Sequence, residues 1–303
     1  MRKHLPLLLI GGFCALFLGA HSAVSRYLMQ GDYLSDRAPM STDKPDFTAF
    51  SSVAERKQAF FGFMEDYVLQ RNQELRQLRQ RIAADKLSDG ELLELAQRYR
   101  VKSDDPAEIR RRLLLKVDAL PPSLVLAQGA IESAWGTSRF AVEGNNYFGQ
   151  WCFSPGCGLV PAARQQGKAH EVRVFEDPAA SVKSYMRNLN SHPAYVSLRQ
   201  ARAELRAQGA PLNGCYLATG LGKYSEKGEV YIEALKRMIR VNDLETDPQG
   251  YCAPVMLADE EPSAPEQSPS AAVGDNADDP QEMAADESQQ ESSPASSQPV
   301  PSG

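Results

Sequence analysis

Strong nucleophiles and metal ligands are scarce in this sequence. Its 303 residues include 4 histidines and 5 cysteines, and neither His170 nor His192 has a nucleophile within reach along the sequence. A basic cluster that would indicate nucleic-acid binding is also missing, because "EIRRRLLLK" (residues 108–116) has the pattern of a solvated helix face. We therefore expect no nucleic-acid partner, no metal and no cofactor, and look for chemistry among the carboxylates and aromatic residues.

The two ends of the chain differ from its middle. Residues 1–20 combine a basic start with a nearly uncharged apolar run, a pattern typical of a secretory leader or a marginal membrane span. We expect residues 1–23 to be a cleaved signal peptide or an anchor that holds the protein to the inner membrane through residues 5–20. Either alternative predicts a periplasmic or cell-envelope protein.

The C-terminal end is strongly acidic. Residues 259–303 contain eleven acidic residues and no Lys or Arg, which predicts a disordered tail. Because the whole chain carries a charge of −6 and the tail −11, residues 1–258 carry +5. A positive charge of this size favours binding to an anionic polymer, although such a charge more often affects only solubility.

Four cysteines lie outside the leader, and their even number favours two disulfides in an exported protein. Cys152 and Cys157 flank a Ser-Pro-Gly turn in "WCFSPGCGLVP", which predicts a small disulfide-closed loop and leaves Cys215 and Cys252 as the second pair. A metal site is the alternative, but no His or carboxylate shares that spacing.

Apolar residues recur at helical spacing through most of the middle. They predict one long helix from about Phe60 to Ile82, a second that begins near Ser88, and a third capped by Asp105 with Glu108 completing a capping box. Further helices are predicted after Asp177, in the stretches 192–209 and 228–244, and in 123–136. Only "HEVRVFEDP" (170–178) alternates like a strand, with "ARQQGK" before it as a hairpin turn.

These elements predict a mainly α (α+β) fold with a small β-hairpin insertion. After a linker at 24–49, we expect an N-terminal helical segment at 50–120 and a second domain at 121–250.

One carboxylate lies in an apolar run, "SLVLAQGAIESAWGTSRFA" (123–141). Glu132 falls beside the apolar face of the predicted helix, where a carboxylate is costly unless it is paired or protonated. We expect Gly129 to leave a bare patch of helix for a substrate and Trp135 to shield the carboxylate, as a general acid requires. A solvated surface glutamate is the alternative.

A second segment, "GNNYFGQW" (144–151), places amides beside aromatic rings, a combination that suits the binding of sugars. Its candidates are Asn145, Asn146, Tyr147 and Phe148. An aromatic-rich loop beneath a core is the alternative.

Over residues 121–244 the chain resembles the Bax-like proteins and, more broadly, the bacterial glucosaminidases of glycoside hydrolase family 73. The resemblance is carried by "LAQGAIESAWGTSRFA", "NNYFGQW", "VRVFEDPAASVKSYMRNL" and "KYSEKGEVYIEAL". It implies a lysozyme-like fold and an endo-β-N-acetylglucosaminidase that cleaves β-1,4 bonds after N-acetylglucosamine in the glycan strands of peptidoglycan.

The resemblance also implies roles for single residues. Glu132 maps onto the catalytic Glu, and Tyr224 would orient the sugar or the attacking water. Trp135 and Tyr231 join the substrate-binding candidates, although Tyr231 reads equally as a core tyrosine. For the second carboxylate that glycoside cleavage usually needs, Glu171 is the choice and Glu176 the other candidate. A surface charge at a strand edge is the alternative for Glu171.

Two rival functions remain at this point. A lytic transglycosylase works on the same substrate with a single Glu but ends with an anhydro ring. A catalytically silent scaffold would bind glycan in the envelope without cleaving it.

Overall fold

In the computed structural model of this chain, residues 44–162, 164 and 169–254 are described. The predicted leader, most of the linker, the acidic tail and most of the "ARQQGK" turn lie outside these residues. Within the described ranges, no helix is both long enough and apolar enough to cross a membrane.

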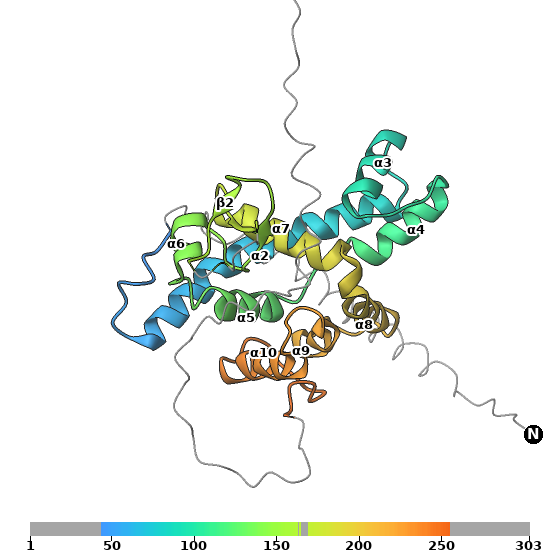
Figure 1. Cartoon of the computed structure of the whole chain (residues 1–303). Helices are drawn as coiled ribbons and strands as arrows, with labels where there is room; N and C mark the ends of the chain where they lie inside the picture. Colours follow the sequence, from blue (N-terminus) through green and yellow to red (C-terminus); the bar gives the residue numbers. More distant parts are fainter. Residues whose placement is uncertain (1–43, 163, 165–168, 255–303) are drawn as a thin grey trace, which may run out of the picture. The chain divides into compact units, whose positions relative to one another are not determined.

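Helices form most of the described chain (Figure 1). The α-helices are α2 (Val53–Ala83), α3 (Asp89–Arg98), α4 (Pro106–Lys116), α5 (Pro122–Glu132), α6 (Arg139–Gly144), α7 (Pro178–Ser191), α8 (Val196–Ala207), α9 (Gly214–Ala218) and α10 (Glu229–Val241). Two 3-10 helices, η1 (Pro193–Tyr195) and η2 (Thr219–Leu221), precede α8 and follow α9.

Three short strands form an antiparallel sheet in the order β1-β3-β2. They are β1 (Trp151–Cys152), β2 (Gly158–Leu159) and β3 (Glu171–Arg173). The predicted fold class, mainly α and lysozyme-like with a small β insertion, is confirmed.

The helix start signals act much as their sequences predict. Ser88 and Glu91 form a capping box, since the Ser88 hydroxyl accepts from the Glu91 amide and the Glu91 carboxylate accepts from the Ser88 amide. Asp105 caps α4 by accepting from the Ala107 amide. The capping box predicted for Asp105 is wrong, because the Glu108 carboxylate accepts instead from Arg111, at 2.7 Å, and from Arg112 one turn ahead.

The long helix α2 packs against α5 and α7, while α3 and α4 lie together near its C-terminal end (Figure 1). Phe60 and the other buried residues of α2 belong to the same hydrophobic core as those of α5, α7 and α10. Asn72 of α2 donates to the carbonyl of Leu120 and accepts from its amide, at 2.8 and 2.9 Å. The segments 50–120 and 121–250 therefore share one core.

A buried ionic cluster joins α2, α8 and the residues before α5. The Asp118 carboxylate accepts from Arg206 at 2.9 Å and lies 3.7 Å from Arg79. Burial alone would raise the pKa of Asp118, but the charges of Arg202 and Arg206 hold it below its ordinary value. This carboxylate therefore stays ionised and ties the helices together.

Candidate active site

Glu132 is the last residue of α5, and the chain turns sharply just after it. Ala134, Trp135 and Gly136 take left-handed φ angles of 49°, 60° and 77° in succession. The Ser133 hydroxyl donates to the Gly129 carbonyl at 2.6 Å and accepts from the Gly136 amide at 2.9 Å, which holds this turn in place. The half-buried Glu132 side chain thus stands at the end of a buried helix, before a braced left-handed turn.

The start of α5 is also anchored. The helix begins at Pro122, so Ser123 lies inside its first turn and donates to Glu245 at 2.7 Å. The Glu245 carboxylate also accepts from the amides of Gly214 and Cys215, at 2.7 and 3.0 Å. One carboxylate therefore ties the beginning of α5 to the beginning of α9.

A chain of hydrogen bonds leads from Glu132 into the core. The Tyr231 hydroxyl donates to Oε1 of Glu132 at 2.6 Å, and Nε2 of Gln128 donates to the Tyr231 hydroxyl at 3.0 Å. The Tyr185 hydroxyl donates to Oε1 of Gln128. All three residues behind Glu132 are buried, and they come from α5, α7 and α10.

Burial sets the protonation state of the neighbouring tyrosines. It raises the pKa of Tyr231 and Tyr224 well above the ordinary value of a phenol, and the negative charge of Glu132 adds to the effect. The pKa of Tyr185 is raised in the same direction, again mainly by burial. These hydroxyls therefore keep their protons and act as donors.

Tyr224 lies in the turn before α10, and the structure brings it to the same place as Tyr231. The two rings stack with centroids 5.4 Å apart and planes at 11°. The Tyr224 hydroxyl donates to the Phe148 carbonyl at 3.3 Å, and the residue is only 3% exposed. Tyr224 thus links the start of α10 to the segment that follows α6.

The two asparagines of that segment hold the backbone in place. Asn145 ends α6 with a left-handed φ of 50°, and its amide donates to the carbonyls of Phe175 and Glu176. Asn146 is buried and donates to the carbonyls of Gln150 and Arg173, at 2.8 and 2.9 Å. Both side chains therefore bind the loop to the segment around β3.

The aromatic residues of the segment lie in the core. Tyr147 and Phe148 are both 0% exposed, and Phe148 stacks on Tyr185 with centroids 3.9 Å apart. In this arrangement neither ring offers a face to a ligand. They form the support beneath the Glu132 site, which was the alternative reading of the segment.

Two glycines adjoin this support. The expectation that Gly129 leaves a bare patch of helix is wrong, because a Cβ there would lie 3.4 Å from Phe148 and 3.6 Å from Phe60. Its missing side chain lets α5 approach those two rings. Gly149, with φ of 64°, runs past Glu132 so closely that a Cβ would lie 3.9 Å from Oε2.

Trp135 packs on α2 rather than on the sugar-binding candidates. Its ring lies 5.2 Å from Phe61 and 6.0 Å from Phe60 in edge contacts, and the Lys57 ammonium lies 4.9 Å from its centroid. Trp135 itself lies in the turn that follows Glu132, and the residue is half-buried.

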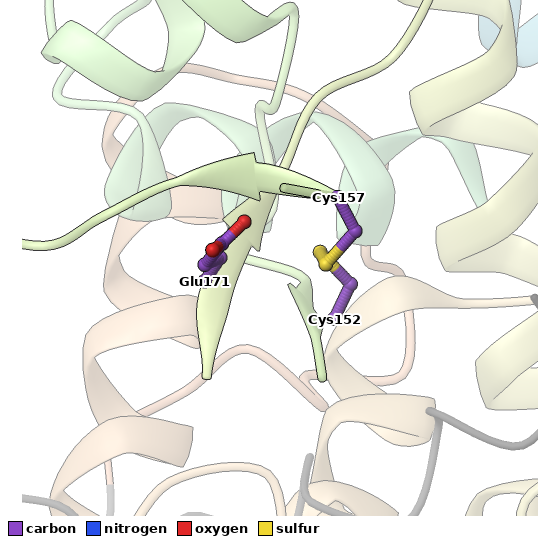
Figure 2. Close-up of side chains that lie close together, drawn as sticks. All are labelled: Cys152, Cys157 and Glu171. Atoms are coloured by element: carbon purple, nitrogen blue, oxygen red, sulfur yellow. A yellow bond between two sulfur atoms is a disulfide. The ribbon is translucent and has the colours of Figure 1, made fainter. Parts of the chain in front are cut away.

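Glu171 lies in β3, opposite Cys152 of β1 (Figure 2). Its two carboxylate oxygens accept from the amides of Gly156 and Gly158, at 3.0 and 2.8 Å. These bonds lower its pKa below the ordinary value of a glutamic acid. Glu171 is buried and holds the loop between β1 and β2, whereas Glu176, the other candidate, is exposed.

Both predicted disulfides, Cys152–Cys157 and Cys215–Cys252, are present. Each has a carboxylate within 4.8 Å, Glu171 beside the first and Glu245 beside the second. The sulfurs are bonded to each other, so they do not offer the thiolates that a metal site requires.

Comparison with known proteins gives the family. Residues 107–244 match the model of the Glucosaminidase family, described as mannosyl-glycoprotein endo-beta-N-acetylglucosaminidase. The chain is 32% identical over 217 residues to the Escherichia coli (strain K12) protein named Protein bax, covering 69% of this chain and 77% of that protein. This chain belongs to the Bax-like glucosaminidase-domain proteins. The comparison with solved structures finds no match.

The likeness between this Bax-like protein and its relative extends beyond the glucosaminidase part. A match over 69% of 303 residues is longer than the stretch from residue 107 to the end, so it must include residues before 107. The sequence likeness to the relative therefore includes at least part of the segment before the family match.

Some residues of the glucosaminidase site were not singled out from the sequence. Gln128 and Tyr185 are absent from the predicted set, and Gly149 was noted only as part of its segment. One signal was present for Gln128, since a polar residue four positions before Glu132 lies on the same helix face. Tyr185 offered none, because it is 53 residues away in the sequence.

Proposed function

We propose that this protein is a peptidoglycan hydrolase, an endo-β-N-acetylglucosaminidase in which Glu132 is the general acid. The observation that carries the proposal is a half-buried carboxylate at a helix end, held at 2.6 Å by a buried tyrosine. Membership of a glucosaminidase-domain family supports the class of reaction. It also supports a glycan as the partner.

In this proposal Glu132 gives its proton to the glycosidic oxygen as the bond between that oxygen and the sugar carbon breaks. Positive charge then develops on the sugar ring, and water later adds to the same carbon and returns a proton to Glu132. The position of Glu132 suits an acid, since the negative end of the α5 dipole favours the neutral carboxyl over the carboxylate.

The developing positive charge needs a second group. Glu171 is the sequence candidate, but both of its carboxylate oxygens already accept backbone hydrogen bonds. We therefore propose that the 2-acetamido group of the substrate assists the reaction and that Glu171 is a positioning residue for the loop between β1 and β2.

For substrate contact, Trp135 is the best supported of the predicted residues, because it is half-buried and lies in the turn that follows Glu132. We propose that Asn145, Asn146, Tyr147 and Phe148 act through the backbone and the core that they hold, because their side chains are bonded or buried. Tyr224 and Tyr231 position Glu132 and its surroundings.

The proposed site of action is the periplasm or cell envelope. The apolar leader, the two disulfides and a substrate found outside the cytoplasm support this location. Residues 5–20, the anchor candidate, lie outside the described residues.

The test is digestion of purified peptidoglycan by the full chain, followed by chemical reduction and mass analysis of the fragments. The proposal predicts reduced N-acetylglucosamine ends from the unmutated protein, none from Glu132→Gln, and full activity from Glu94→Gln, which changes an exposed carboxylate on α3. Anhydro ends would indicate a transglycosylase. Binding without cleavage would indicate the silent scaffold.

A further inference from the structure

We propose that Tyr185, Gln128 and Tyr231 form a one-way chain of hydrogen bonds that positions Glu132 and assigns the catalytic proton to its Oε2 oxygen. This inference rests on the proposed function and specifies the site at the level of single atoms. In it, Glu132 is the catalytic residue, and the other three are positioning residues.

The direction of the chain follows from counting protons. Tyr185 donates to Oε1 of Gln128, so the Gln128 amide group turns toward Tyr231 and donates to its hydroxyl oxygen. The Tyr231 proton is then available only for Glu132. If Gln128 were turned over, its NH2 group would face the Tyr185 hydroxyl and could not accept the Tyr185 proton, so this bond would be lost at a cost of about 1–3 kcal/mol for a buried group.

The direction decides which oxygen of Glu132 can carry a proton. Oε1 accepts from Tyr231 at 2.6 Å, and an oxygen that accepts a hydrogen bond along this line acts as the carbonyl oxygen of a neutral carboxyl group. We place the acidic hydrogen on Oε2, the oxygen that does not accept from Tyr231. Gly149 passes on that side, where the absence of a side chain leaves Oε2 within 3.9 Å of the position that a Cβ would occupy.

The chain also couples Glu132 to the packing of three helices. Gln128 lies one turn before Glu132 on α5, whereas Tyr185 and Tyr231 come from α7 and α10. All three are at most 7% exposed, so bulk water does not compete for their hydrogen bonds. Tyr185 is fixed in turn by the stacked Phe148 ring. The orientation of the carboxyl group is therefore set from the core.

Two variants test the chain on the full-length protein, each with one hydroxyl removed. We expect Tyr231→Phe to lower kcat about 10- to 100-fold, the equivalent of one or two lost hydrogen bonds, with KM changed less than twofold. Tyr185→Phe leaves the hydrogen bond from Tyr231 to Glu132 in place, but it lets Gln128 turn over and draw the Tyr231 proton away. We expect it to lower kcat by about 3- to 30-fold. Tyr216→Phe, which loses a surface bond to Glu204, is the matched control with unchanged kcat.

A second readout does not depend on activity. The carboxyl carbon of Glu132 is followed by 13C NMR during a pH titration, with Glu132→Gln used to assign the signal. Removing a donor from Oε1 destabilises the carboxylate, so the midpoint is expected to move to higher pH in Tyr231→Phe and in Tyr185→Phe. It should not move in Tyr216→Phe.

The outcomes separate this inference from the proposed function. An unmutated protein that cleaves no glycan contradicts the proposed function, while a shifted midpoint in Tyr185→Phe still supports the chain. Normal cleavage by Tyr185→Phe, with the midpoint of the unmutated protein, would overturn the chain and leave the proposed function standing.

Discussion

The most direct test of the Glu132 site is the substitution of Gly149 by alanine. Gly149 has φ of 64°, and its added Cβ would lie 3.9 Å from Oε2 of Glu132, an ordinary van der Waals contact. The methyl group therefore fits the folded protein, but it lies beside the oxygen that we propose to carry the catalytic proton and that a glycosidic oxygen would have to approach to about 3 Å. We therefore expect Gly149→Ala to lose more activity than its loss of stability can explain.

The two effects can be separated by a glycine with the same backbone conformation. Gly209, at the end of α8, also has φ of 64°, and a Cβ there would meet no atom within 4 Å. Both Gly→Ala changes therefore carry the same left-handed strain, about 1–2 kcal/mol of unfolding free energy. Only the change at residue 149 places a methyl group beside Glu132.

The assay compares the two variants in urea unfolding and in release of new reducing ends from peptidoglycan. We expect similar unfolding free energies, normal kcat/KM for Gly209→Ala, and a loss of about 100-fold or more for Gly149→Ala, the equivalent of about 3 kcal/mol in the transition state. Similar kcat/KM values for the two variants would refute the placement of Oε2 as the proton-carrying oxygen.

Three further outcomes are expected. Tyr147→Phe removes a buried hydroxyl that has no hydrogen-bond partner among the described residues, so urea unfolding should show unchanged or higher stability, by up to about 1 kcal/mol. Glu171→Gln leaves one loop amide without a strong acceptor and should lower Tm while keeping more activity than Glu132→Gln. Burial, followed by nearby positive charges, lowers the pKa of His192 to about 4. As the pH falls, His192 is therefore protonated earlier in the unfolded chain than in the folded protein. The free energy of unfolding has its full value above pH 6.5 and decreases as the pH drops toward 4. The loss is about 2 kcal/mol after allowance for solvent screening. His192→Asn keeps an acceptor for the Ala194 amide and should not show this loss in urea unfolding at pH 7 and pH 4.5.

Local chemistry explains which parts of the fold could be predicted from the sequence. Ser88, Asp105 and Asp177 each accept from an amide two or three residues ahead, so their helices begin where the residue types indicate. The short loop between Cys152 and Cys157 likewise brings its cysteines together through an adjacent turn. Glu132 could be singled out for a similar reason. A carboxylate among apolar residues of a predicted helix is energetically unfavourable, and the neighbouring residues alone make this visible.

Sequence alone therefore determined the mainly helical fold, the Cys152–Cys157 loop, and Glu132 as the leading candidate, because each depends on neighbours close in the chain. Cys215 and Cys252, 37 residues apart, followed only as the remaining pair. Only the tertiary structure decided what surrounds the Glu132 carboxylate. Tyr231 and Gln128 meet across 103 residues, and Gln128 and Tyr185 across 57. The tertiary structure also places Glu171 against the loop amides and two aromatic rings against Gly129. Such contacts depend on how helices pack, and no local pattern specifies which distant side chain will meet a given hydroxyl or glycine.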